Sequence, residues 1–238
     1  MFVEVRKSEE MDYYRGQKCK ERNEHVPIFA FGHYIPVGEG GDEFSKKVNG
    51  FHQHGYYFDY FLERLINFYN KRVKGDIAFD IICVCPSHEK DHINENMVHL
   101  ATAFSEKVGI PYNQILIRVK ETKRQHEMKT DEQRKENVRG SFSLSENLKD
   151  KNIMILDNTS ITTETSQEIY RVMKDADAKI CLFISLGLGA KAIDCDFDIN
   201  PTYPGKVSKI IKDWHWPKVS VEERKAHKRE KEGADKNC

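Results

Sequence analysis

The feature that most constrains this chain is an apolar run that ends abruptly in polar residues. Residues 153–156 are all apolar, and Asp157 and Asn158 follow them at once. Beyond a stretch rich in hydroxyl side chains, Ile169, Val172 and Met173 recur with the spacing of one helical face. The sequence therefore predicts a buried strand, a turn and a helix, with polar chemistry at the carboxyl end of the strand.

Such a turn suits a phosphate group. Successive backbone N–H groups and the positive end of the helix dipole bind an anion without a lysine. Asp157, at the strand end, would accept two hydroxyl hydrogen bonds or bind a hard cation such as Mg²⁺. Hydroxyl donors would come from Thr159, Ser160, Thr162, Thr163 and Thr165. The alternative interpretation is a plain turn, since Ser, Thr, Asp and Asn are favoured before any helix.

The same alternation of elements recurs along the chain. Apolar strands are predicted at 79–85, 114–119, 153–156 and 180–186, and amphipathic helices at 58–69, 93–108 and 168–175. Strand, helix and strand in short succession are typical of right-handed parallel crossovers. We therefore expect an α/β fold with an open parallel sheet and helices on both faces, whose ligands bind beyond the carboxyl ends of the strands.

Three segments interrupt or flank this pattern. Residues 120–150 are long, polar and charge-rich, which predicts a flexible lid. Residues 1–25 are predicted to be a charged extension and residues 218–238 a charged tail. The domain itself is expected to span residues 26–217, entered by a strand within residues 26–37.

Composition narrows the function classes. The 38 basic residues balance the 38 acidic ones, so the net charge gives no whole-chain argument for a nucleic-acid partner. The apolar runs are too short to span a bilayer and the first six residues lack a signal-peptide core, which predicts a soluble, cytoplasmic protein with no membrane partner. The six cysteines include no CxxC pair that would indicate zinc.

Two blocks of this sequence resemble the type I phosphoribosyltransferases, most closely the competence-protein-F-like branch related to amidophosphoribosyltransferase. The first block resembles that branch's segment before its signature strand: Arg118, Thr122, Gln125, Met128, Arg134 and residues 137–142. The second, at residues 153–165, resembles the signature for phosphoribosyl pyrophosphate (PRPP), in which an apolar strand precedes two acids and a phosphate loop. The resemblance covers about residues 28–186 and implies this family's fold, with a small hood over the sheet.

The resemblance implies a PRPP site that uses Mg²⁺. Asp157 and Asn158 would contact the ribose hydroxyls, with Asp157 beside the metal. The 5′-phosphate would lie in the loop Thr159, Ser160, Ile161, Thr162, Thr163, Glu164 and Thr165. Pyrophosphate would meet Pro86, Ser87 and His88, beneath hood residues Arg118, Gln125 and Arg134. The implied activity is transfer of a phosphoribosyl group to an acceptor that the sequence does not identify, or hydrolysis of a related nucleotide.

Three residues depart from the family pattern. Asn158 replaces the second acid, Thr163 stands where the phosphate loop carries glycine, and Glu164 adds a negative charge beside the phosphate. These departures keep open a catalytically degenerate module that senses a nucleotide, or that binds a protein partner or a second copy. The resemblance associates such modules with bacterial DNA uptake and antiviral defence against phage. Independently of catalysis, the plain alternative for Arg134 is pairing with Glu132 and Glu136 on a solvated helix, and the plain alternative for Gln125 is to cap a turn.

A competing metal motif is present at residues 88–92, whose letters match HExxH. On a helix, His88 and His92 would share a face as zinc ligands, with Glu89 as the general base of a hydrolase. The charged residues between the ligands and the position at a strand end argue against that helix. His52 and His54 are expected in an exposed loop.

Overall fold

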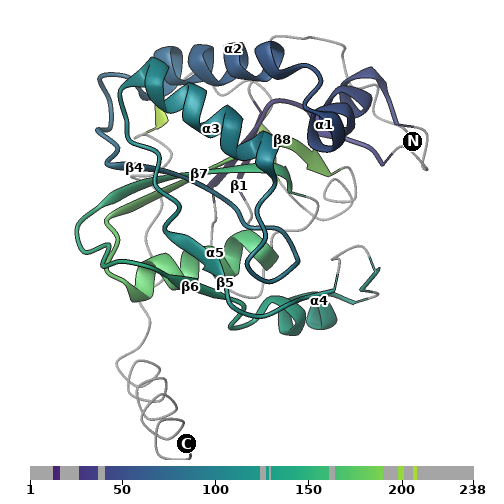
Figure 1. Cartoon of the computed structure of the whole chain (residues 1–238), viewed down its shortest axis with the longest axis vertical. Coiled ribbons are helices and arrows are strands. Elements are labelled where there is room, and N and C mark those ends of the chain that lie inside the picture. Colours follow the sequence, from purple (N-terminus) through teal and green to yellow (C-terminus); the bar gives the residue numbers. More distant parts are fainter. Residues whose placement is uncertain are drawn as a thin grey trace, which may run out of the picture.

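The fold is seen in a computed structural model that describes residues 13–16, 27–36, 41–123, 127–128, 130–160, 164–189, 198–200 and 206–207. Within these residues the centre is a seven-stranded sheet in the order β4-β7-β8-β2-β1-β9, with β3 also paired to β8 (Figure 1). Its strands are β1 (Tyr13–Gly16), β2 (Pro27–Ala30), β3 (His33–Tyr34), β4 (Ile81–Val84), β7 (Asn152–Ser160), β8 (Ile180–Gly189) and β9 (Asp198–Asn200).

The central strands confirm the predicted parallel sheet. Strands β4, β7, β8 and β2 are paired in parallel, whereas β1 is antiparallel to both β2 and β9. Strand β1 falls within residues 1–25, the segment predicted to be a charged extension, and its backbone is part of the sheet. The domain boundaries at residues 25 and 217 stay predictions.

Helices cover both faces of this sheet, as predicted. One face carries α1 (Glu43–His54), α2 (Phe58–Phe68), which continues as a π-helical turn at Tyr69–Val73, and α3 (Glu95–Val108). The opposite face carries α5 (Glu164–Asp175) (Figure 1). None of the helices in the described part of the chain is both long and apolar enough to cross a bilayer.

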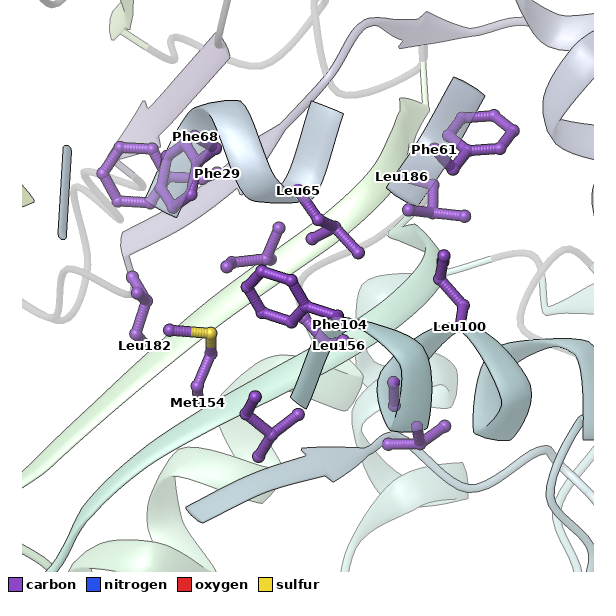
Figure 2. Close-up of a cluster of buried hydrophobic side chains, with 14 of the residues drawn as sticks. Phe29, Phe61, Leu65, Phe68, Leu100, Phe104, Met154, Leu156, Leu182 and Leu186 are labelled. Atoms are coloured by element: carbon purple, nitrogen blue, oxygen red, sulfur yellow. The ribbon is translucent and has the colours of Figure 1, made fainter. Parts of the chain in front are cut away.

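The side chains of β7 supply both halves of the core. Because successive residues of a strand point to opposite faces, Met154 and Leu156 pack toward α1–α3, while Ile153 and Ile155 pack toward α5. Figure 2 shows Met154 and Leu156 among the aromatic and leucine side chains of the first cluster. All four are essentially inaccessible to solvent, so burial on both faces fixes the register of this strand.

The strand predicted at 114–119 does not join the main sheet. After α3 the chain meets β4 through a parallel bridge between Ile82 and Tyr112. The Gln114 side chain then takes the place of a strand backbone, because its amide donates to Val84 O at 2.9 Å and accepts from Val84 N at 3.3 Å. The next residues form β5 (Leu116–Arg118), which pairs antiparallel with β6 (Phe142–Leu144) in a separate two-stranded sheet.

Part of the segment predicted to be a flexible lid, residues 120–150, has regular structure. Helix α4 (Asp131–Val138) begins with a capping box between Thr130 and Gln133. Val138 of this helix is buried, and Phe142 and Leu148 are buried in the core cluster that includes side chains of α5. The prediction missed this structure because the buried residues are too widely spaced to give a periodic pattern. We call the unit formed by β5, α4 and β6 the hood.

Candidate functional site

A cavity of about 480 Å³ lies beyond the carboxyl ends of β4 and β7. Its walls come from the end of β7, the start of α5, the loop after β4, the hood, and the helices α1 and α3. The residues predicted from the sequence that line it are Pro86, Ser87, His88, Arg118, Asp157, Asn158, Thr159, Ser160 and Thr165. The structure therefore brings two of the predicted groups, the strand end and the pyrophosphate loop, together with one hood residue.

Strand β7 is longer than predicted, which corrects the position of the turn. It continues to Ser160, and Asp157 and Thr159 pair with Ser185 and Gly187 of β8. The N–H groups of Asn158 and Thr159 donate to the side chains that precede them, Asp157 Oδ1 at 2.9 Å and Asn158 Oδ1 at 2.7 Å. These amides are therefore already bonded and do not form a phosphate-binding bend.

The remainder of the predicted phosphate loop is only partly described. Ile161, Thr162 and Thr163 lie outside the described residues. Glu164 and Thr165 open α5, where Thr165 contributes to the cavity wall and Glu164 does not. An anion at this end of the cavity would therefore meet the hydroxyl of Thr165 and the first turn of a twelve-residue helix.

Asp157 supplies a carboxylate to the wall of the cavity. Burial raises the pKa of its carboxyl to about 7, although the hydrogen bond from the Asn158 N–H and the charge of Arg118 act in the opposite direction. Near neutral pH the group is therefore divided between its protonated and ionised forms. It is suited both to accept a hydrogen bond and to bind a cation once ionised.

Arg118 places a positive charge in the cavity wall that the hood forms. Its side chain is 3% exposed, and Nη1 donates to Ser141 Oγ at 2.9 Å and to Thr122 Oγ1 at 3.3 Å. The guanidinium lies 4.1 Å from the centre of the Phe142 ring, while Nε is buried with no hydrogen-bond partner among the described residues. Burial lowers the pKa of this group, although the nearby Cys85 and Asp157 act to raise it.

This arginine has no salt bridge to a carboxylate within the described residues, since hydroxyls supply its short contacts. A buried cation that lacks a close ion pair is costly. An anionic ligand in the cavity would offset that cost, so the electrostatics of this wall favour phosphate or pyrophosphate.

The loop after β4 is a tight turn and not a helix, which makes the zinc-hydrolase alternative wrong. Ser87 N donates to His92 O at 3.0 Å, and Ser87 Oγ lies 2.9 Å from His92 Nδ1. Residues 88–92 are bends and turns, so the two histidines of the HExxH match do not share a helical face. No cluster of three or more potential metal-ligating side chains occurs in the described part of the chain. The loop instead docks on the hood, because Thr122 N donates to His88 O at 3.0 Å.

One of the three predicted hood residues lies in the cavity wall within the described residues. Arg118 lines the cavity, but Gln125 lies outside the described residues. Arg134, on α4, donates from Nη2 to Met128 O at 3.0 Å and is not part of the cavity wall.

The hood contributes one residue to the cavity that sequence reasoning missed. Asn137 holds the backbone of Lys123 by two hydrogen bonds, of 3.0 and 2.8 Å, and Lys123 is at the wall of the cavity. Its ammonium adds a second cation to the hood side of the site. The sequence does contain a signal for this contact. The run at residues 137–142, which carries part of the family resemblance, begins with Asn137, the residue that holds Lys123.

His52 is another cavity residue that sequence reasoning missed. The expectation that His52 and His54 lie in a loop is wrong, because both belong to α1, where His54 is exposed and His52 is half-buried at the cavity. The Asn158 Nδ2 atom lies 2.7 Å from His52 Nδ1. The sequence contains a signal for this helix, because Asp42 and Gly55 are residue types that favour the N-cap and the C-cap of a helix.

Comparisons with known proteins were made for sequence and for structure. No protein-family model matches the sequence, and no curated protein matches it. Similar solved structures include the glutamine PRPP amidotransferase from B. subtilis, at 18% identity over 59% of this chain with a TM-score of 0.35. They also include adenine phosphoribosyltransferases from Leishmania tarentolae, at 11% identity over 69% of this chain with a TM-score of 0.37, and from Leishmania donovani, at 13% over 74% with a TM-score of 0.39.

The lengths of these proteins differ. The chain spans 30% of the length of the amidotransferase, but 92% and 82% of the two adenine phosphoribosyltransferases. The two Leishmania structures carry the name adenine phosphoribosyltransferase, and the competence-protein-F-like branch stays a prediction.

Proposed function

We propose that this protein binds PRPP, or a nucleotide through its 5′-phosphate, and transfers the phosphoribosyl group to an acceptor. The observation that supports this most is that Asp157 and Arg118 line the same cavity. The first is a carboxylate at the end of a parallel strand, and the second is a buried guanidinium with no salt bridge among the described residues. A sugar that carries hydroxyls at its centre and phosphates at its ends complements both groups.

The proposed binding mode follows from the walls of the cavity. The ribose hydroxyls would donate to Asp157, and the 5′-phosphate would meet Thr165 at the start of α5. Pyrophosphate would lie between the loop after β4, represented by Ser87, and the hood cations Arg118 and Lys123. Arg118 is suited to this role because its guanidinium can contact phosphate oxygens in a bidentate manner.

Mg²⁺ fits the cavity through one protein carboxylate, that of Asp157. Mg²⁺ in phosphate-transfer sites keeps several waters and takes one or two carboxylates together with substrate phosphates. Asp157 supplies such a carboxylate, and its Oδ1 already accepts from the Asn158 N–H. The ion would offset the charge of the pyrophosphate leaving group. Its binding requires ionised Asp157, whose pKa is about 7.

The residues of the chain act on a reaction in which the bond from ribose to pyrophosphate breaks. Positive charge then develops on the sugar and negative charge on pyrophosphate. Ionised Asp157 would stabilise the first charge and Arg118 the second, both from fixed positions in a partly buried site. The hood would hold the reactants in place and exclude water, which favours transfer over hydrolysis.

Isothermal titration calorimetry with Mg²⁺·PRPP tests this proposal. Wild type should bind, and Asp157→Asn, which keeps the shape but loses the charge, should weaken binding by about 10- to 100-fold, as expected for a hydrogen bond to a charged group. Asp59→Asn, an exposed position on α2, is the matched control and should bind like wild type. No binding by wild type, or equal binding by Asp157→Asn, would refute the proposal.

One observation favours the second candidate, a binding module without turnover. The position of the second acid is Asn158, and its amide is engaged with His52 and with the Thr159 N–H. Release of pyrophosphate from PRPP decides between the two: release by wild type excludes the module, whereas binding without release supports it. A protein partner, self-association and a role in DNA uptake or phage defence belong with this second candidate.

A further inference from the structure

An imidazole and two amides form a cluster at the α1 wall of the cavity. The Nδ2 atoms of Asn158 and Asn94 lie 2.7 Å and 3.2 Å from the same atom, His52 Nδ1. The three residues come from β7, from the N-cap of α3 and from α1. All three line the cavity.

The orientation of both amides is fixed by backbone groups. Asn158 Oδ1 accepts from the Thr159 N–H at 2.7 Å, so its Nδ2 must be the atom that faces the ring. Asn94 Oδ1 caps α3 by accepting from Met97 N at 3.1 Å, and its Nδ2 also donates to His52 O at 3.0 Å. Exchanging oxygen and nitrogen in either amide would place an N–H against a backbone N–H.

The protonation state of His52 follows from these orientations. An amide NH₂ group only donates, so an Nδ1 atom that faces two of them must offer its lone pair. The ring is then neutral and carries its proton on Nε2. A proton on Nδ1 would meet two donors and remove the acceptor that the Asn158 amide faces.

We propose that His52 is the ligand-contacting residue at this wall, donating from Nε2–H to an oxygen of the phosphoribosyl ligand, and that Asn158 is a positioning residue that holds its tautomer. This rests on the proposed function. The role expected for Asn158 from the sequence, direct contact with a ribose hydroxyl, therefore moves to His52, because both ends of the Asn158 amide are used within the protein.

The alternation of side chains along β7 explains why Asp157 and His52 would contact the ligand from different sides. Asp157 and Asn158 are consecutive in a strand, so they point to opposite faces of the sheet. Asp157 lies on the side of Arg118 and the hood, whereas Asn158 reaches α1. The ligand would then be held between a carboxylate acceptor on one side and a neutral imidazole donor on the other.

Nitrogen NMR of the full chain with ¹⁵N-labelled histidine tests the tautomer without any ligand. The His52 signals are assigned by their loss in His52→Gln. We expect an unprotonated Nδ1 and a protonated Nε2 in wild type. In Asn158→Asp the carboxylate should attract a proton to Nδ1. A protonated Nδ1 in wild type, or no change in Asn158→Asp, would overturn the proposal.

Calorimetry with Mg²⁺·PRPP tests the ligand contact. The amide nitrogen of glutamine can reach the position of His Nε2, whereas that of asparagine reaches only the position of Nδ1. His52→Asn should therefore weaken binding about tenfold, and His52→Gln should stay within about threefold of wild type, as expected for one neutral hydrogen bond. Thermal unfolding of both variants reports whether the fold is kept.

The two proposals fail in different ways. Binding by wild type with equal affinity for His52→Asn would overturn the role of His52 and leave the proposed function standing. Equal losses in His52→Asn and His52→Gln would also overturn it, because a structural role for the ring would account for both. No binding by wild type would overturn the proposed function, and the ligand contact of His52 with it.

Discussion

Replacing Asp157 with asparagine should stabilise the protein above neutral pH while it weakens the proposed binding of Mg²⁺·PRPP. The carboxyl has an ordinary pKa of 3.8 and a pKa of about 7 in the folded protein, because burial disfavours its charge. Between these two values the folded state binds more protons than the unfolded state. The stability of wild type must therefore fall as the pH rises through this window.

The size of the effect follows from the part of the window that an experiment covers. Between pH 5 and the pKa of about 7, the carboxyl stays protonated in the folded protein but is ionised in the unfolded protein. Over these roughly two pH units, each unit lowers the free energy of unfolding of wild type by about 1.36 kcal/mol. The stability gained by Asp157→Asn should thus be about 2–3 kcal/mol larger at pH 8 than at pH 5. The substitution keeps an oxygen to accept the Asn158 N–H, so its other structural effects cancel between the two pH values.

Urea unfolding of wild type and Asp157→Asn at both pH values measures this difference. Groups that titrate elsewhere contribute equally to both proteins and cancel. Asp59→Asn is the control, and its difference from wild type should not change between pH 5 and pH 8. A gain for Asp157→Asn that is the same at both pH values, or smaller at pH 8, would refute the argument that this carboxylate is held at a cost in stability for use by a ligand.

Three further predictions concern the same site and its supports. Affinity for Mg²⁺·PRPP should rise by up to about tenfold per pH unit as the pH approaches 7 from below and then level off, because only ionised Asp157 binds the ion; a flat calorimetric profile from pH 5.5 to pH 8 would contradict this. Gln114→Ala should cost about 2–3 kcal/mol in urea unfolding, since it removes both bonds to Val84 at the edge of β4; a loss below 0.5 kcal/mol would contradict it. Glu168→Ala should speed hydrogen exchange of the hood amides, because Oε1 of this buried carboxylate accepts from Gly140 N at 2.8 Å; unchanged exchange would show that the contact does not hold the hood.

The parallel sheet could be predicted because its strands are covered on both faces. The run Ile153 to Leu156 is apolar throughout, and its odd and even residues enter two different cores. The polar end of the same strand could not be predicted. Asp157 and Ser160 pair with β8 as the apolar residues do. Their side chains are polar and line the cavity, so no pattern of apolar residues marks this part of the strand.

A second limit of sequence reasoning is that a side chain can bond to a strand edge where a neighbouring strand is expected. The Gln114 side-chain amide bonds to the edge of β4, whereas the sequence pattern predicted that Gln114 belongs to a strand. The contact between His52 and Asn158 joins residues 106 positions apart, and it depends on how α1 is placed over the sheet. Helix caps can predict that α1 exists, but only tertiary packing decides which of its residues faces the cavity.

A crystal structure of the protein with Mg²⁺ and PRPP would show whether Asp157, Arg118 and His52 hold the ligand as proposed. We expect the ribose beside the Asp157 carboxylate, pyrophosphate in contact with the Arg118 guanidinium, and a hydrogen bond from His52 Nε2 to a ligand oxygen. A ligand bound elsewhere, or a cavity in which Arg118 contacts no phosphate, would contradict this expectation.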